Sequence, residues 1–209
     1  MWMRRVFAGA AALSIITGAF WLAQRNDLTA PATAEAAAQP GATVEAPQRI
    51  ALRPGEAPVL INVDAQYVAL IGASAPRNPS AVAQAQGAAY AKITAYLEAR
   101  GIQMAGAPMM ITTKIDKTRV HFDAGIPVAA DGAYDPGTGV RIVARPAIKA
   151  VKVVNTGPYE SLDAAYSRLD AYVAANGLEP NGGPWESYVD DPTLTAPDQL
   201  RTEIFVPVR

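Results

Sequence analysis

The chain has 209 residues, a formal net charge of −1 at pH 7 and 18% charged residues, which suits one domain with a non-globular segment and excludes multi-domain machinery. The near-neutral charge argues against a surface that coats nucleic acid. With no cysteine and a single histidine, the sequence excludes disulfides, thiolate zinc sites, Fe–S clusters and the common multi-histidine metal sites, so we expect no metal and no cofactor.

Residues 1–26 have the pattern of a signal peptide or membrane anchor. Arg4 and Arg5 precede residues 6–23, a run of eighteen residues without a charge. As a helix this run would be about 27 Å long, close to the roughly 30 Å of a bilayer core, whereas cleaved signals have an apolar stretch of ~7–15 residues. The small residues at 32–34 form an alternative cleavage site. We therefore expect either an inner-membrane anchor through residues 6–23 with the domain facing the periplasm, or secretion to the periplasm, because the arginines before the run stay inside.

Residues 27–49 are rich in Ala, Pro, Thr, Glu and Gln, and Leu28 and Val44 are their bulky apolar residues. Such a segment cannot bury enough apolar surface to offset the entropy lost on ordering. We predict a disordered linker, followed by one domain over residues 50–209.

The domain contains an internal repeat. Residues 88–108 and 164–184 are identical at 9 of 21 positions without a gap, at a constant offset of 76 residues. Both halves also close on a similar tripeptide, Ile126-Pro127-Val128 and Val206-Pro207-Val208. A repeat of this length changes the expected fold, because each copy must then form one structural unit. We predict two copies, at about residues 59–128 and 148–208.

Each copy predicts the same order of elements. In the first copy, extended patterns at 59–71, 109–115 and 119–126 surround a helical pattern that includes Tyr90. In the second, extended patterns at 148–154, 185–189 and 201–206 surround a helical pattern that includes Tyr166. Gly101 and Gly177 are the expected helix ends. The predicted fold class is α+β, a duplicated βαββ module with pseudo-two-fold symmetry and a central cleft between the copies.

Particular runs of the sequence carry a family resemblance. They are V-N-T-G-P-Y-E-S-L at 154–162, G-G-P-W-E-S-Y at 182–188, R-T-E-I-F-V-P-V at 201–208 and F-D-A-G-I-P-V at 122–128. Together they resemble the GyrI-like small-molecule-binding domain, the domain of the gyrase-inhibitory protein and the effector-binding half of many AraC- and MerR-type regulators. The resemblance implies the duplicated βαββ fold, a shape shared with haem-binding SOUL proteins. Where the regulators carry a helix-turn-helix domain this chain has an apolar segment and a linker, so we expect no nucleic-acid partner.

The resemblance also implies a ligand. In this family a glutamate in the strand after Gly-Pro contacts lipophilic cations, and Glu186 is the matching residue. A carboxylate among aromatic rings favours a cation, because ring faces add cation–π attraction of ~0.5–2 kcal/mol each. We therefore expect a small amphipathic or cationic ligand. The candidate ligand-binding residues are Glu186, Tyr188, Tyr159, Trp185, Glu203 and Phe205.

Strand alternation divides these candidates, since Glu186 and Tyr188 share one face and Trp185 points to the other. Glu203 and Phe205 likewise share a face of the last strand. The repeat places Met110 at the position of Glu186, so the shared scaffold does not require the carboxylate.

Alternatives remain open from the sequence. Tyr159 in Gly-Pro-Tyr also fits a local turn contact, and Tyr90, Tyr96, Tyr166 and Tyr172 fit a core that covers the sheet, since they recur in both copies. His121 fits a surface or packing role. A second function is hydrolysis of small strained, cyclopropane-type compounds, as in some GyrI-like proteins, although no residue is assigned a catalytic role. Haem binding, by analogy with SOUL proteins, is the third.

Overall fold

The computed structural model describes residues 57–129 and 137–209. The predicted membrane segment at 6–23 and the linker at 27–49 lie outside these ranges. In the described part of the chain, no helix is both long and apolar enough to cross a membrane. The first half contains β1 (Val59–Val63), β2 (Gln66–Pro76), α2 (Pro79–Arg100), β3 (Met109–Ile115) and β4 (Arg119–Val128). The second contains β5 (Arg141–Arg145), β6 (Ile148–Thr156), η3 (Tyr159–Ser161), α3 (Leu162–Ala175), β7 (Trp185–Tyr188), η4 (Pro197–Gln199) and β8 (Arg201–Pro207).

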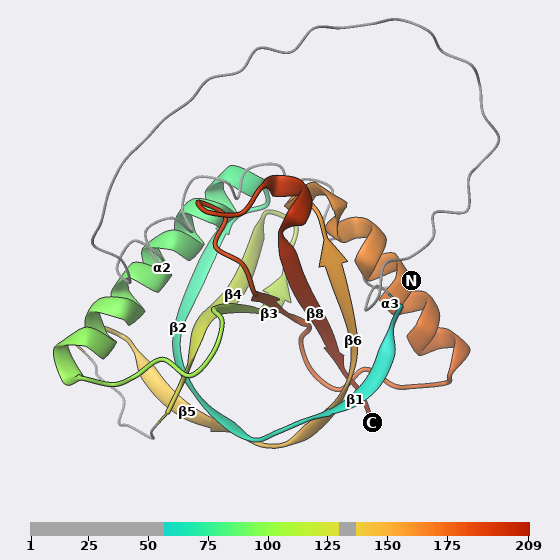
Figure 1. The fold of residues 1–209 in the computed structure, drawn as a ribbon, viewed down its shortest axis with the longest axis horizontal. Coiled ribbons are helices and arrows are strands. Elements are labelled where there is room, and N and C mark those ends of the chain that lie inside the picture. The colour runs from blue at the N-terminus through green and yellow to red at the C-terminus, as the bar shows by residue number, and fades with distance from the viewer. Residues whose placement is uncertain (1–56, 130–136) are drawn as a thin grey trace, which may run out of the picture.

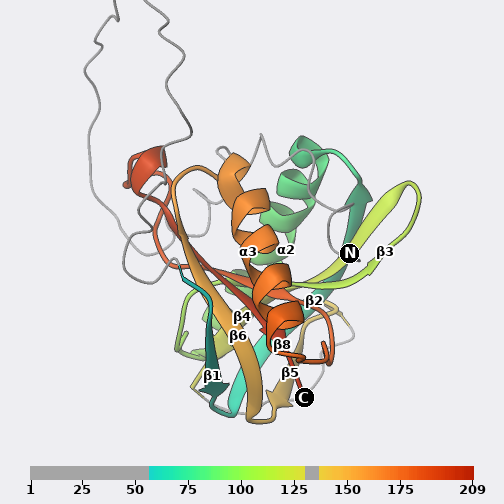
Figure 2. The same ribbon diagram turned by 90° about the vertical axis from the view of Figure 1, so that its right-hand side faces the viewer.

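The strands form one antiparallel eight-stranded sheet in the order β1-β6-β8-β7-β3-β4-β2-β5. The sheet curls into a half-barrel, and α2 and α3 flank it on the left and right of Figure 1. Helix α2 packs on β2 and β4, whereas α3 packs on β6 and β8, and Figure 2 shows the same arrangement from the side. This is a mixed α and β fold, in agreement with the class expected from the sequence.

The two halves of the sheet meet where β3 pairs with β7. Three pairs of residues define the register, and Met110 lies opposite Glu186 in the central pair. The pairing continues on each side through backbone hydrogen bonds from Thr112 N to Pro184 O (3.0 Å) and from Tyr188 N to Pro108 O (2.9 Å). Glu186 therefore lies in the middle of the sheet, on a strand that is paired on both sides.

Local signals explain both helices. Asn78 caps α2 by accepting a hydrogen bond from the Ala81 amide at 2.8 Å, and Pro79 occupies the first turn. The helix ends at Gly101, whose φ of 63° is in the left-handed region. In α3 the last helical residue is Ala175, and Gly177 adopts the corresponding left-handed φ of 62°. Both glycines thus end their helices as the sequence predicts.

Alternation along the strands produces two apolar clusters on opposite faces of the sheet. The larger, which we call the helix-side cluster, joins residues of α2 and α3 to strand residues such as Ala69 and Ile71. The smaller lies on the face away from the helices, which we call the helix-free face. Its buried members are Val68, Leu70, Met109, Ala150, Trp185 and Phe205.

Two features of the sheet differ from the sequence prediction. The single strand expected at 59–71 is two strands, because the chain turns after Val63 and places β1 beside β6 but β2 between β4 and β5. Strand β5 was not predicted at all. Its sequence, R-I-V-A-R, is short and carries an arginine at each end, so its extended character depends on pairing with β2 rather than on its own pattern.

Candidate functional site

A buried carboxyl group surrounded by tyrosines lies under helix α3. The Glu186 side chain accepts hydrogen bonds from the hydroxyls of Tyr166 (2.8 Å, to Oε1) and Tyr188 (2.7 Å, to Oε2). The ring of Tyr159 meets that of Tyr188 edge to face, with centroids 5.9 Å apart. We call these four residues the tyrosine–carboxyl cluster. Glu186 is 2% exposed, so the carboxyl group is enclosed and does not face an open cleft.

Burial controls the protonation of this cluster. Desolvation raises the pKa of Glu186, and the hydrogen bonds from Tyr188 and Tyr166 offset part of that rise. The pKa values of Tyr166 and Tyr188 are raised in turn, first by burial and then by the Glu186 charge. Both hydroxyls therefore stay protonated and donate. Among the described residues, no basic side chain forms an ion pair with Glu186.

In the two halves of the chain, the matching helix tyrosines donate their buried hydroxyls to different acceptors. Tyr90 and Tyr166 occupy matching positions in their helices, 76 residues apart. The Tyr166 hydroxyl donates to Glu186, whereas the Tyr90 hydroxyl donates to the Met109 carbonyl at 2.9 Å. A buried tyrosine hydroxyl needs an acceptor, and in the first half Met110 supplies none, so Tyr90 uses the backbone.

A second polar group borders the cluster from helix α2. The Gln86 amide, 1% exposed, donates from Nε2 to the Tyr90 hydroxyl at 3.0 Å. Its carbonyl oxygen has no hydrogen-bond partner in the structure described. An unpaired buried acceptor is unfavourable by roughly 1–3 kcal/mol. Two hydrogen-bond acceptors therefore lie in this region, the Glu186 carboxylate and the Gln86 amide oxygen.

The other three predicted residues lie on the helix-free face, not in the cluster. Trp185 and Phe205 stack there with centroids 4.7 Å apart and planes inclined by 6°. The protein's own cations cover both rings, since Arg145 lies 4.5 Å from the Trp185 centroid and Lys152 lies 5.6 Å from the Phe205 centroid. Glu203 pairs with Lys152 at 2.6 Å. The predicted ligand residues thus form two groups separated by the sheet.

Three residues near these groups were not identified from the sequence as site residues. Tyr166 was interpreted as core because Tyr90 repeats it, and the repeat gave no sign that the two hydroxyls have different acceptors. Arg145 belongs to the unpredicted strand β5. Lys152 is an ordinary alternating position of β6, and only its pairing with the Phe205 position on β8 brings it over that ring.

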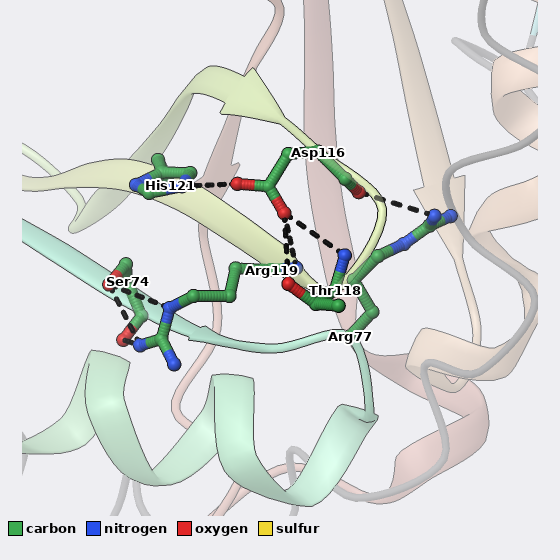
Figure 3. Close-up of polar contacts among 6 residues, drawn as sticks. All are labelled: Ser74, Arg77, Asp116, Thr118, Arg119 and His121. Atoms are coloured by element: carbon green, nitrogen blue, oxygen red, sulfur yellow. Dashed lines mark hydrogen bonds and ion pairs between the residues drawn. The ribbon is translucent and has the colours of Figure 1, made fainter.

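His121 is part of a separate polar group on the β3–β4 hairpin (Figure 3). Its Nε2 lies 3.0 Å from Asp116 Oδ2, and Asp116 Oδ1 accepts from the Thr118 and Arg119 amides at 3.0 and 2.8 Å. The hydrogen bond from His121 holds the pKa of Asp116 well below its usual range. The Arg119 guanidinium donates to the carbonyl and the hydroxyl of Ser74. The Arg119 contacts tie the hairpin to β2, whereas His121, with its side chain 36% exposed, makes its contact within the hairpin.

Known structures share this fold. The crystal structure of the EcmrR C-terminal domain superposes with a TM-score of 0.64 at 23% identity, covering 73% of this chain and 96% of that domain. A hydrolase from Listeria innocua gives a TM-score of 0.55 at 14% identity, covering 75% and 94%. The EcmrR chain in a cryo-EM EcmrR–DNA complex gives 0.60 at 22%, and the chain spans 57% of its length.

Sequence comparison gives the family directly. No curated protein sequence matches the chain. Residues 58–209, which include every described strand and both helices, match the family model of the GyrI-like small molecule binding domain. The chain belongs to the GyrI-like family of small-molecule-binding domains.

Proposed function

We propose that the domain binds amphipathic organic cations and that the tyrosine–carboxyl cluster is the ligand site. The observation that carries this proposal is the Glu186 carboxyl group, buried with two tyrosine hydroxyls and no ion-pair partner among the described residues. Ionising it in that environment is unfavourable without a positive charge nearby. A cation with an apolar body would supply that charge and pack against the rings.

The same geometry requires the site to open for a ligand. Glu186 and Tyr188 are 2% and 1% exposed, and Tyr159 and Tyr166 are both 4% exposed. A ligand can reach the carboxyl group only after side chains of η3 and α3 move aside. Binding therefore includes a conformational step, whose free energy reduces the observed affinity.

The test is Glu186→Gln, which keeps the shape of the side chain and removes its charge. A charge-assisted hydrogen bond contributes ~1.5–3 kcal/mol, so the affinity for a lipophilic cation such as a rhodamine dye should drop roughly 10- to 150-fold. A neutral analogue of the dye should bind both proteins alike. Fluorescence titration of both dyes gives the four affinities, and thermal unfolding verifies that the variant is folded.

Glu203→Gln is the matched control, since Glu203 pairs with Lys152 on the opposite face of the sheet. It should leave dye affinity unchanged. Equal affinities of wild type and Glu186→Gln for the cationic dye would remove Glu186 from the site. A loss in Glu203→Gln alone would instead place the cation on the helix-free face.

Hydrolysis of small strained compounds is the second candidate, and one observation favours it. Tyr166 and Tyr188 place two protonated hydroxyls within hydrogen-bond distance of Glu186, so a candidate base and candidate proton donors lie side by side. The raised pKa of Glu186 also lets that carboxyl group keep its proton to a higher pH than an exposed glutamate does. Product formation from a cyclopropane-containing substrate, abolished in Glu186→Gln, would establish hydrolysis. Haem binding has less support, because His121 Nε2 already contacts Asp116.

We also propose that the two halves are copies of one βαββ module. Strand β2 precedes α2, β3 and β4 just as β6 precedes α3, β7 and β8. The reciprocal hydrogen bonds Thr112 N to Pro184 O and Tyr188 N to Pro108 O join positions related by the 76-residue offset. An approximate two-fold axis between Met110 and Glu186 would account for both observations.

Location completes the proposal. The charge order of residues 1–26 favours an inner-membrane anchor or export to the periplasm, with ligands reaching the domain from outside the cytoplasm. The linker at 27–49 would separate the domain from the membrane. A reporter at the C-terminus that is active only outside the cytoplasm tests this location.

A further inference from the structure

Strands β5 and β6 place three basic side chains on the helix-free face, and one of these three lacks an acidic partner. Arg141 pairs with Asp123 at 2.7 Å, and Lys152 pairs with Glu203 at 2.6 Å. Arg145 pairs with no carboxylate in the described part of the chain. Its polar contact there is a 3.5 Å approach of Nη1 to the Met109 thioether, which is a weak acceptor.

Arg145 is, in addition, partly removed from water. The guanidinium carbon lies over the Trp185 ring at 4.5 Å, and burial lowers the pKa of the group. Stacking uses the flat face of a guanidinium and leaves its N–H edges free to donate. Arg145 thus has a partly desolvated positive charge and several N–H donors without a strong acceptor.

The apolar cluster beneath Arg145 is bordered by side chains that are partly open to solvent, and Gln66 of β2 lies opposite Arg145 in the strand register. Met109 and Trp185, below the guanidinium, are buried, whereas the residues that border them are half-buried aliphatic side chains. These bordering residues are Ile61, Val63, Ile111, Val143 and Ile148. Val59, on the same side of β1 as Ile61, is 48% exposed. A molecule held at Arg145 would therefore lie against apolar surface.

We propose that the helix-free face binds a small amphipathic carboxylate, with Arg145 as its anchor and the bordering aliphatic residues as the surface for its alkyl body. A carboxylate matches the paired N–H groups of a guanidinium in a bidentate hydrogen bond. The alkyl chain removes apolar surface from water, which favours binding at roughly 25 cal/mol per Å². This site is distinct from the tyrosine–carboxyl cluster, lies on the other face of the sheet and takes the opposite charge.

Trp185 provides the signal for the test. The full chain has three tryptophans, and Trp2 and Trp21 lie outside the described residues. In the full chain with Trp2→Phe and Trp21→Phe, emission reports on the ring beneath Arg145. Titration with sodium octanoate should change that emission, and calorimetry should give the same affinity. The neutral analogue 1-octanol should bind at least 10-fold more weakly, since it cannot accept the bidentate charge-assisted pair.

Variants of Arg145 test whether its guanidinium holds the carboxylate. Arg145→Gln should weaken octanoate binding by roughly 10- to 150-fold. Arg145→Lys should weaken it less, because lysine keeps the positive charge but lacks the paired N–H groups of the guanidinium. Lys149→Gln is the control for the loss of one positive charge, since Lys149 is exposed on the helix side of β6. Separate titrations of the wild type with octanoate and with the cationic dye give each site its own result, so failure here is separable from failure of the cation site.

Three results would each overturn the proposal. They are the absence of octanoate binding by both methods, equal affinity of the wild type for octanoate and octanol, and equal octanoate affinity in the wild type and the Arg145 variants. The comparison of octanoate with octanol uses the wild-type side chain at position 145, so it decides the question even if Arg145→Gln does not fold.

Discussion

Position 186 shows how one residue changes the chemistry of a repeated scaffold. Met110 and Glu186 lie opposite each other where the halves of the sheet join, and both are buried. The methionine is an ordinary core residue there, whereas the glutamate fixes two tyrosine hydroxyls and introduces a titratable group. A buried acid without a basic partner reduces stability when it ionises, so its presence favours a role in binding over a role in folding.

Glu186 therefore predicts an unusual dependence of stability on pH. Its pKa is raised above the ordinary 4.5 in the folded state, so the folded protein binds the proton more tightly than the unfolded chain. Stability falls as pH rises from about 4.5 through the raised pKa, by at most about 1.4 kcal/mol per pH unit, and the full penalty is present above it. Urea unfolding from pH 4.5 to 9 should show this fall in the wild type.

Glu186→Gln cannot titrate at this position and is the comparison. Its stability relative to the wild type should increase with pH up to the raised pKa and then level off, while affinity of the wild type for a permanent cation should rise over the same range. Two stability curves that run parallel across the whole range would show that Glu186 does not carry a raised pKa.

The residue scale also shows what sequence can predict of a site. Alternation alone assigns Glu186 and Trp185 to opposite faces, and the structure places them so. The acceptor of a helical tyrosine is different, because it depends on how the helix is rotated and shifted over the sheet. Tyr166 and Tyr90 look identical in the repeat, and only their contacts with Glu186 and with the Met109 backbone distinguish them.

At the scale of elements, the pairing of β3 with β7 depends on close approach of the backbone. A Cβ atom on Gly183 would lie 2.0 Å from the Thr112 carbonyl oxygen, and neither group belongs to a flexible side chain. Gly183→Ala must push the two strands apart. We expect a loss near the upper end of the about 1–3 kcal/mol typical of overpacking, measured as a shift of the urea midpoint.

Gly72→Ala is the matched control within the same sheet. Its added Cβ would meet Asp123 Oδ1 at 3.5 Å, an ordinary contact, and removing a glycine from a strand usually gains about 0.5–1 kcal/mol. The control should therefore be neutral or slightly stabilising. A mild effect of both substitutions would mean that the β3–β7 pairing adjusts easily.

The elements differ in how much the sequence reveals. Both helices follow from apolar spacing, with their ends marked by Gly101 and Gly177, and the strands between them follow from β-rich runs. The break between β1 and β2 does not, since Asp64 and Ala65 are a weak turn signal and the separation arises because the two strands pair at opposite sides of the sheet. Strand β5 likewise depends on its pairing with β2, and no local sequence pattern predicts that pairing.

At the scale of the whole molecule, the proposed location gives a direct prediction. On this proposal Arg4 and Arg5 would hold the start of the chain inside, so a reporter enzyme fused after Arg209 should be active outside the cytoplasm. Exchanging both arginines for glutamate should reduce export, since the positive charges set the orientation. Comparing periplasmic and cytoplasmic reporters gives the result, and activity confined to the cytoplasm would refute the proposal.

Strand β7 is four residues long and contributes to both faces of the sheet, with Glu186 and Tyr188 on one side and Trp185 on the other. The proposed cation and carboxylate sites would consequently share a wall one backbone thick. Any shift of β7 that one ligand favours is imposed on the other site, and thermodynamic linkage makes the effect equal in both directions. Binding of one ligand would then change the affinity for the other without contact between them. A favourable coupling free energy would mean that the two ligands bind together, and an unfavourable one would mean that each weakens binding of the other.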